Sequence, residues 1–234
     1  MIRELVLDTE TTGLSPENGD KIVEIGIVEL INHIPTKNVF HNYLNPKRLV
    51  HASAFKVHGL SNEFLKDKPL FSEISDEMLN FIGDDSIIIH NAPFDLGFLN
   101  NELSNINYRL INSSQVIDTL ILARQKYPGS PASLDALCRR FSINNVNRNL
   151  HGALLDSHIL AKVYLELIGG SQPNLQFTET QSFNNKVLKT NNKTKVDKPF
   201  RSINSSGRLT EEERKKHKDY ISKLNGLRKW SVYN

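Results

Sequence analysis

The sequence predicts an α/β domain built on a mixed five-stranded sheet and followed by a polar tail. Two observations predict the domain: apolar runs alternate with segments of helical periodicity up to residue 170, and the first three runs follow one another with no helix between them. A third observation sets the tail apart. Residues 171–234 carry 14 Lys and Arg but 6 Asp and Glu, whereas residues 1–170 have a net charge of −5.

The strands are expected in five apolar runs, at residues 4–8, 21–30, 38–44, 86–90 and 115–119. Residues 31–38 are expected to join the second strand to the third. Helical spacing of apolar side chains predicts helices within residues 71–84, 92–103, 118–127, 133–141 and 151–170. We expect Asp118 and Ser133 to cap the third and fourth helices, and Gly169 to end the last one.

The composition sets the expected compartment. The single cysteine, Cys138, can form no disulfide within the chain, which suits a reducing compartment. No apolar run approaches the ~18 residues of a membrane helix. Met1 is followed at once by a strand pattern rather than by a basic and apolar leader. We therefore expect a cytoplasmic protein.

Two acidic residues stand one residue apart at the end of the first strand. Side chains two positions apart on a strand point to the same face, about 7 Å apart at the backbone, so Asp8 and Glu10 converge. Without a counter-charge, one carboxyl would be driven to keep its proton. A divalent cation removes this conflict, because carboxylate oxygens suit Mg²⁺ and Mn²⁺. Taken alone, however, this spacing is more often a strand end that enters solvent.

Three more residues change this interpretation. Asp95 falls in the first turn of a helix that follows a strand, and Asp156 falls near the start of the last helix. His151, five residues before Asp156, fits the loop that enters this helix. Each has an ordinary explanation when taken singly. Asp95 would interact with the dipole of its helix, Asp156 would be an exposed acid on a helix, and His151 would be a histidine on a loop. Together with Asp8 and Glu10 they predict a site for two metal ions, because open α/β sheets gather ligands at the carboxyl ends of their strands.

Three short motifs carry a family resemblance. The segments DTETTG, HNAPFD and HGALLD resemble, in this order, the three exonuclease motifs of the DEDDh family. Longer segments, among them KIVEIGIVEL, FKVHGLSNEFLKDKP and HGALLDSHILAKVYL, resemble the proofreading members of that family. The resemblance covers nearly all of residues 1–170. It implies an RNase H-like fold and 3′→5′ hydrolysis of DNA that releases 5′-mononucleotides.

The resemblance also implies roles for the five residues. Two divalent cations, Mg²⁺ or Mn²⁺, would lie about 4 Å apart, with Asp8 bridging them. Glu10 and Asp156 would hold the cation nearer the nucleophile, and Asp95 the other. His151 is the candidate general base, since an unperturbed imidazole titrates near pH 6.5.

Substrate contacts are likewise implied by the resemblance. His58 resembles a residue of the family loop that contacts the terminal nucleotide, and Ser53 sits where that loop begins. Glu10 and Asp156 are expected to contact the same nucleotide. For Ser53 the alternative, a loop that merely packs on the sheet, stays open. A net acidic domain should bind the frayed 3′ primer end of DNA weakly by itself, because phosphate binding rests on Lys and Arg.

The first part of the tail, residues 171–207, is expected to be a flexible linker. It is rich in Asn, Lys, Thr and Ser and has few large apolar residues. At its start, Gln172, Leu175 and Phe177 resemble the peptide that docks in the pocket of a sliding clamp. The alternative is an extended linker with stray apolar residues.

The last part, residues 208–234, is expected to form a short helix that attaches the chain to a polymerase catalytic (alpha) subunit. Thr210 and Glu213 have the spacing of a capping box, and Trp230 is an aromatic anchor. Its positive charge could instead bind DNA directly. A small accessory (theta-like) subunit is a further partner that the resemblance suggests. The rival interpretations of the chain are a stand-alone DEDDh nuclease that trims DNA or RNA ends and a non-catalytic adaptor.

Overall fold

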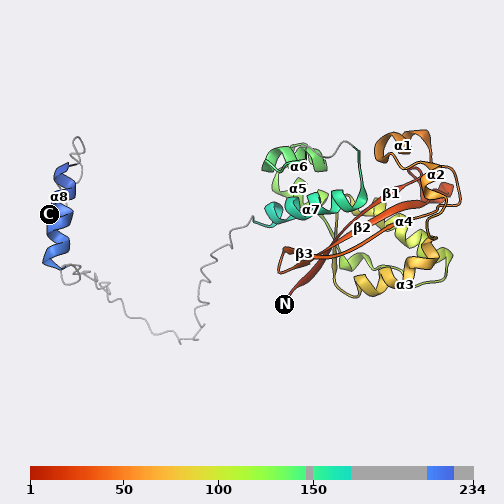
Figure 1. Ribbon diagram of the computed structural model, residues 1–234, viewed down its shortest axis with the longest axis horizontal. Helices are drawn as coiled ribbons and strands as arrows, with labels where there is room; N and C mark the ends of the chain where they lie inside the picture. Colours follow the sequence, from red (N-terminus) through yellow and green to blue (C-terminus); the bar gives the residue numbers. More distant parts are fainter. Residues whose placement is uncertain (146–149, 170–209, 224–234) are drawn as a thin grey trace, which may run out of the picture. The chain divides into compact units, whose positions relative to one another are not determined.

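The computed structural model describes residues 1–145, 150–169 and 210–223. The chain divides into two compact units, Met1–Phe177 and Thr178–Asn234, which are described separately. In the first unit, helices lie on both faces of a twisted sheet (Figure 1). None of the helices in the described residues is long and apolar enough to cross a membrane.

The sheet has five strands in the order β3-β2-β1-β4-β5. Strands β1, β2 and β3 pair antiparallel, whereas β4 lies parallel to β1 and β5 lies parallel to β4. The predicted mixed five-stranded sheet is therefore confirmed, with β1 at its centre. The strands are β1 (Arg3–Thr11), β2 (Ile22–Ile31), β3 (Ile34–Tyr43), β4 (Ser86–Ile89) and β5 (Val116–Asp118).

The predicted connection over residues 31–38 is wrong. Strand β3 begins at Ile34, so Asn32 and His33 alone join it to β2. Both have left-handed backbone, with φ of 50° and 68°. A two-residue turn with positive φ at both positions matches the twist of the strands it joins, and Asn tolerates this conformation better than most residues.

Within its described residues, the first unit has seven α-helices: α1 (Ala52–His58), α2 (Asn62–Leu65), α3 (Phe71–Ile82), α4 (Ala92–Asn105), α5 (Thr119–Lys126), α6 (Leu134–Phe141) and α7 (Ala153–Ile168). The five helices expected in this unit are α3 to α7. The predicted caps are confirmed, because Asp118 accepts a hydrogen bond from Leu120 N at 2.8 Å and Ser133 accepts one from Ala136 N at 3.3 Å. Gly169 ends α7.

The two faces of the sheet pack against different helices. Leu5 and Leu7 of β1 lie in a core with α3 and α4, whereas Val6, between them, packs with Leu160 of α7. Alternate side chains of a strand point to opposite faces. Asp8 and Glu10 therefore share the α7 face with Val6, and Thr9 shares the α4 face.

The second unit contains α8 (Glu211–Lys223) in its described residues. The predicted capping box is present, since Glu213 N donates to Thr210 Oγ1 at 3.3 Å and Thr210 N donates to Glu213 Oε2 at 2.8 Å. The expected clamp-binding and polymerase-binding side chains lie outside the described residues. These are Gln172, Leu175, Phe177 and Trp230.

A buried carboxylate at the start of β1 ties the sheet to α7. Glu4 is 4% exposed and accepts a hydrogen bond from the Tyr164 hydroxyl at 2.7 Å. Its other oxygen lies 2.6 Å from Nδ1 of His33, in the β2–β3 turn. Burial and the nearby carboxylate raise the pKa of Tyr164, so this phenol stays protonated and donates.

Removing the Tyr164 hydroxyl should destabilise the fold without touching the predicted site. We expect Tyr164→Phe to lower the free energy of unfolding by about 1–3 kcal/mol, because it leaves a buried carboxylate oxygen without its donor. Urea unfolding followed by circular dichroism measures this. Tyr127→Phe, whose ring packs on Phe141 nearer the surface, is the matched control. An equal loss in both variants would contradict the role given to the Glu4 contact.

Candidate active site

The five residues predicted for the site line one cavity. It lies at the carboxyl end of β1 and has a volume of about 310 Å³. Three different elements contribute: β1, the start of α4, and the loop and first turn of α7. The five residues are Asp8, Glu10, Asp95, His151 and Asp156.

Thr9 of β1 holds Asp95 in place. The Asp95 side chain is 4% exposed, and its Oδ1 accepts hydrogen bonds from Thr9 N at 3.0 Å and from Thr9 Oγ1 at 2.7 Å. Burial raises the pKa of Asp95 to about 7, against the opposing effect of these hydrogen bonds. Burial therefore makes this carboxyl easier to protonate than an exposed aspartate.

Asp118 fixes the start of the helix that carries Asp95. Besides capping α5, its carboxylate accepts hydrogen bonds from Asn91 N at 3.1 Å and Ala92 N at 3.2 Å, at the N-terminus of α4. Asn91 has left-handed backbone, with φ of 66°, which lets the chain turn sharply from β4 into α4. The sequence predicts Asp118 as a cap but not this second role, because β4 and β5 become neighbours only in the folded sheet.

Gly26 of β2 lets α7 approach the sheet. A Cβ atom at Gly26 would lie 2.3 Å from Leu154 N and 2.4 Å from the carbonyl carbon of Ala153, in the first turn of α7. The Ser157 hydroxyl donates to the carbonyl oxygen of Gly26 at 2.8 Å. Since Asp156 lies next to Ser157, this close contact sets the depth at which Asp156 enters the cavity.

His151 lies on the loop before α7, as predicted. Its backbone N donates to the carbonyl oxygen of Val57 in α1 at 3.0 Å, and its Nδ1 lies 3.4 Å from Asp156 Oδ2. Its side chain is 44% exposed. The backbone of His151 is therefore held in place by α1, while its imidazole ring faces both the cavity and solvent.

The donor set fits divalent cations. One potential ligand atom each from Glu10, His151 and Asp156 lies within 4.8 Å of the others. Asp8 and Asp95 add carboxylates to the same cavity. Hard oxygen donors in this number suit Mg²⁺ or Mn²⁺, and a cation would relieve the repulsion among the carboxylates.

The predicted substrate contacts, Ser53 and His58, line a neighbouring hollow of about 250 Å³. Both lie on helix α1, so the expected loop is wrong; seven residues were too few for a periodic pattern to reveal a helix. Nδ1 of His58 accepts a hydrogen bond from Leu60 N at 3.0 Å, so the neutral ring carries its proton on Nε2. Burial lowers the pKa of His58 and favours this neutral form. Among the described residues, Nε2 has no hydrogen-bond partner.

The fold and the acidic cavity are those expected of an exonuclease, and the family comparison agrees. Residues 5–164 match the model of the Exonuclease family (RNase_T). The match spans more than half of the chain, and the chain belongs to this family.

Two curated relatives and one solved structure show which members of this family the chain is similar to. The chain is 47% identical over 232 residues to the DNA polymerase III subunit epsilon of Rickettsia conorii, covering 95% of this chain and 96% of the relative. It is 49% identical over 175 residues to the subunit of the same name from Escherichia coli, covering 72% of each chain. Among solved structures it is similar to exonuclease X in complex with 5′ overhanging duplex DNA, with a TM-score of 0.56 and 27% identity, over 70% of this chain and 90% of that one.

Substituting Gly26 tests how the fold positions the site. We expect Gly26→Ala to lower exonuclease turnover at least tenfold, because the methyl group would push the first turn of α7, and with it Asp156, out of the cavity. Release of labelled nucleotide from a single strand measures turnover. Gly97→Ala is the matched control, since a Cβ atom at Gly97 meets nothing within 4 Å. Full activity in folded Gly26→Ala would contradict this role.

Proposed function

We propose that this chain removes nucleotides from the 3′ primer terminus as the proofreading exonuclease subunit of a replicative DNA polymerase. One observation carries the proposal: the four predicted carboxylates and the His151 imidazole line a single cavity at the carboxyl end of β1. Membership of the exonuclease family supports the reaction. Identity to DNA polymerase III epsilon subunits along nearly the whole chain supports the biological setting.

The carboxylates would hold two divalent cations, Mg²⁺ or Mn²⁺. Asp8 would bridge them, Glu10 and Asp156 would bind on the side of His151, and Asp95 would bind on the other side. When bound, such cations stabilise the negative charge that develops on the attacking and leaving oxygens at phosphorus. The grouping of Glu10 and Asp156 with His151 supports this division.

His151 would accept the proton of the attacking water. Its position beside Asp156 favours this, because a nearby carboxylate orients the ring and stabilises the imidazolium that forms. Its partial exposure lets the proton then pass to solvent. The backbone contact to Val57 keeps the loop in place during this transfer.

The hollow beside α1 would hold the terminal nucleotide. The Nε2–H of His58 would donate to an oxygen of this nucleotide, which would satisfy a buried donor that has no partner among the described residues. Ser53 lines the same hollow and offers a hydroxyl. Glu10 lines both this hollow and the acidic cavity, and Asp156 would join it in contacting the nucleotide where the reaction occurs.

The tail would attach the exonuclease, residues 1–170, to its partners in the cytoplasm. Residues 208–234 would bind the polymerase alpha subunit. The linker, residues 171–207, would carry a peptide for the sliding clamp, and a small theta-like subunit would bind the exonuclease unit. Tethering raises the effective concentration at the primer end to about millimolar, which compensates for weak DNA binding.

Replacing His151 tests the general base. We expect His151→Ala to lower turnover about 10²–10⁴-fold, because proton transfer would lose its acceptor. Release of mononucleotides from a 3′-labelled strand with Mg²⁺ measures this. Mn²⁺ titration by calorimetry and DNA binding should stay near wild type. Near-normal turnover would exclude His151 from the role.

Truncation tests the division between catalysis and attachment. We expect a chain that stops after Gly170 to keep its rate of hydrolysis, because the apolar cores around β1 and α7 lie within the residues it retains. It should no longer co-purify with the polymerase. Loss of hydrolysis by the folded truncated chain would argue against this division.

A further inference from the structure

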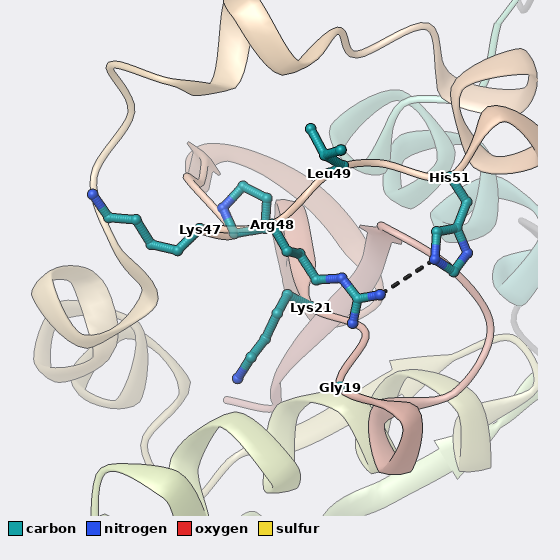
Figure 2. Close-up of a pocket in the computed structure, with 7 residues that line it drawn as sticks. Gly19, Lys21, Lys47, Arg48, Leu49 and His51 are labelled. Carbon is teal, nitrogen blue, oxygen red and sulfur yellow. Dashed lines mark hydrogen bonds between the residues drawn. The ribbon is translucent and has the colours of Figure 1, made fainter.

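A basic hollow lies beside the proposed nucleotide pocket, on the segment that follows β1 and the segment that follows β3. Its volume is about 580 Å³. Figure 2 shows the side chains of Lys21, Lys47 and Arg48 around this hollow. Arg48 Nη2 makes a hydrogen bond with His51 Nε2 at 3.2 Å. The lining contains no acidic residue among those that the structure describes. The lining residues are Gly19, Lys21, Pro46, Lys47, Arg48, Leu49 and His51.

The segment that carries Lys47 is held rigidly. Asn45 N donates to the Pro69 carbonyl at 2.9 Å, and the Asn45 side chain donates to the Lys66 carbonyl at 2.6 Å. Lys47 N donates to Asn45 Oδ1 at 2.9 Å. Lys47 has left-handed backbone, with φ of 52°. The fold therefore fixes a strained turn that presents a lysine at the hollow.

Arg48 is fixed by Asp20. Its Nη2 lies 3.2 Å from Asp20 Oδ1, and its Nη1 donates to the Asn18 carbonyl at 3.3 Å. Asp20 is 4% exposed, and hydrogen bonds from Ser15 N and the Thr12 hydroxyl, with Arg48, lower its pKa against the effect of burial. A guanidinium has five N–H donors, so Arg48 keeps donors for a ligand in the hollow.

The hollow and the nucleotide pocket share a wall. A Cβ atom at Gly13, which lines the nucleotide pocket, would lie 2.4 Å from Asp20 Oδ2. His51, which lines the basic hollow, donates its backbone N–H to the Thr12 carbonyl at 3.0 Å and begins the helix that carries Ser53. The segments that line the basic hollow are therefore in direct contact with those that line the nucleotide pocket.

We propose that this hollow binds backbone phosphates of the DNA strand behind its 3′-terminal nucleotide. The proposal rests on the proposed function of the neighbouring site. Lys47 and Arg48 would neutralise phosphates, as cationic grooves do along single strands, whereas the Lys21 ammonium is paired with Glu102 at 2.8 Å. Leu49, which is 74% exposed in the same lining, would contact a sugar or base. In a unit of net negative charge, these cations offer a local path for the strand.

Lys47→Asn tests the proposal, because Asn removes the charge and tolerates the left-handed backbone. We expect KM for a strand of about twelve nucleotides to rise roughly threefold to tenfold with kcat unchanged. The dependence of log kcat/KM on log salt should weaken by about 0.7, the value for one phosphate contact to a single strand. Hydrolysis of a dinucleotide should not change. Lys47→Arg should restore wild-type values, and Lys47→Glu should exceed the effect of Lys47→Asn.

Lys37→Asn is the matched control, since this exposed lysine of β3 loses the same charge outside the hollow. Equal effects of Lys47→Asn and Lys37→Asn would overturn the proposal, as would an unchanged KM for the long strand. An equal rise in KM for the dinucleotide would also overturn it, because Lys47 would then contact the terminal nucleotide rather than the strand behind it. Failure of the wild-type chain to hydrolyse either substrate would instead refute the proposed function.

Discussion

The concentration of the Asp8, Glu10, Asp95 and Asp156 carboxylates, with other acidic lining, in one cavity is the constraint on which the rest of this structure depends. Like charges at this separation repel, and burial adds to the cost, as the raised pKa of Asp95 shows. The arrangement persists because each acid is carried by a rigid element: the central strand, or the first turn of a helix packed on the sheet. Cations would then bind a site that is already formed, and little binding energy would be lost to ordering it.

Contacts between distant parts of the chain hold these elements together. Thr9 binds Asp95 from the neighbouring element, Asp118 caps the start of α4 across the sheet, and Gly26 admits α7 to the depth that Asp156 needs. Each contact links fold stability to site geometry. Substitutions at residues that touch no substrate can therefore alter the reaction.

The exonuclease unit is negatively charged as a whole but has a local cluster of positive side chains. Its net charge is negative, which favours weak binding to DNA and makes attachment to a polymerase useful. Yet Lys21 and the segment around Lys47 and Arg48 come together in one hollow. The sequence shows no basic stripe because these cations lie on two segments more than twenty residues apart. Local positive charge next to a terminal pocket guides a strand without fixing the whole duplex tightly.

The sequence by itself determined the mixed sheet, the five longer helices of the first unit, the caps at Asp118 and Ser133, and five of the residues that line the acidic cavity. These depend on short-range patterns: residue periods, capping preferences and the two-residue spacing of Asp8 and Glu10 on a strand. Only the tertiary structure decided the tight β2–β3 turn, the short helix under Ser53 and His58, and the partners of Gly26, Thr9 and Asp20. The turn and the short helix are too short for a periodic pattern to reveal them. The partners of Gly26, Thr9 and Asp20 follow from packing between separate segments, and a linear pattern carries no record of which atoms will meet.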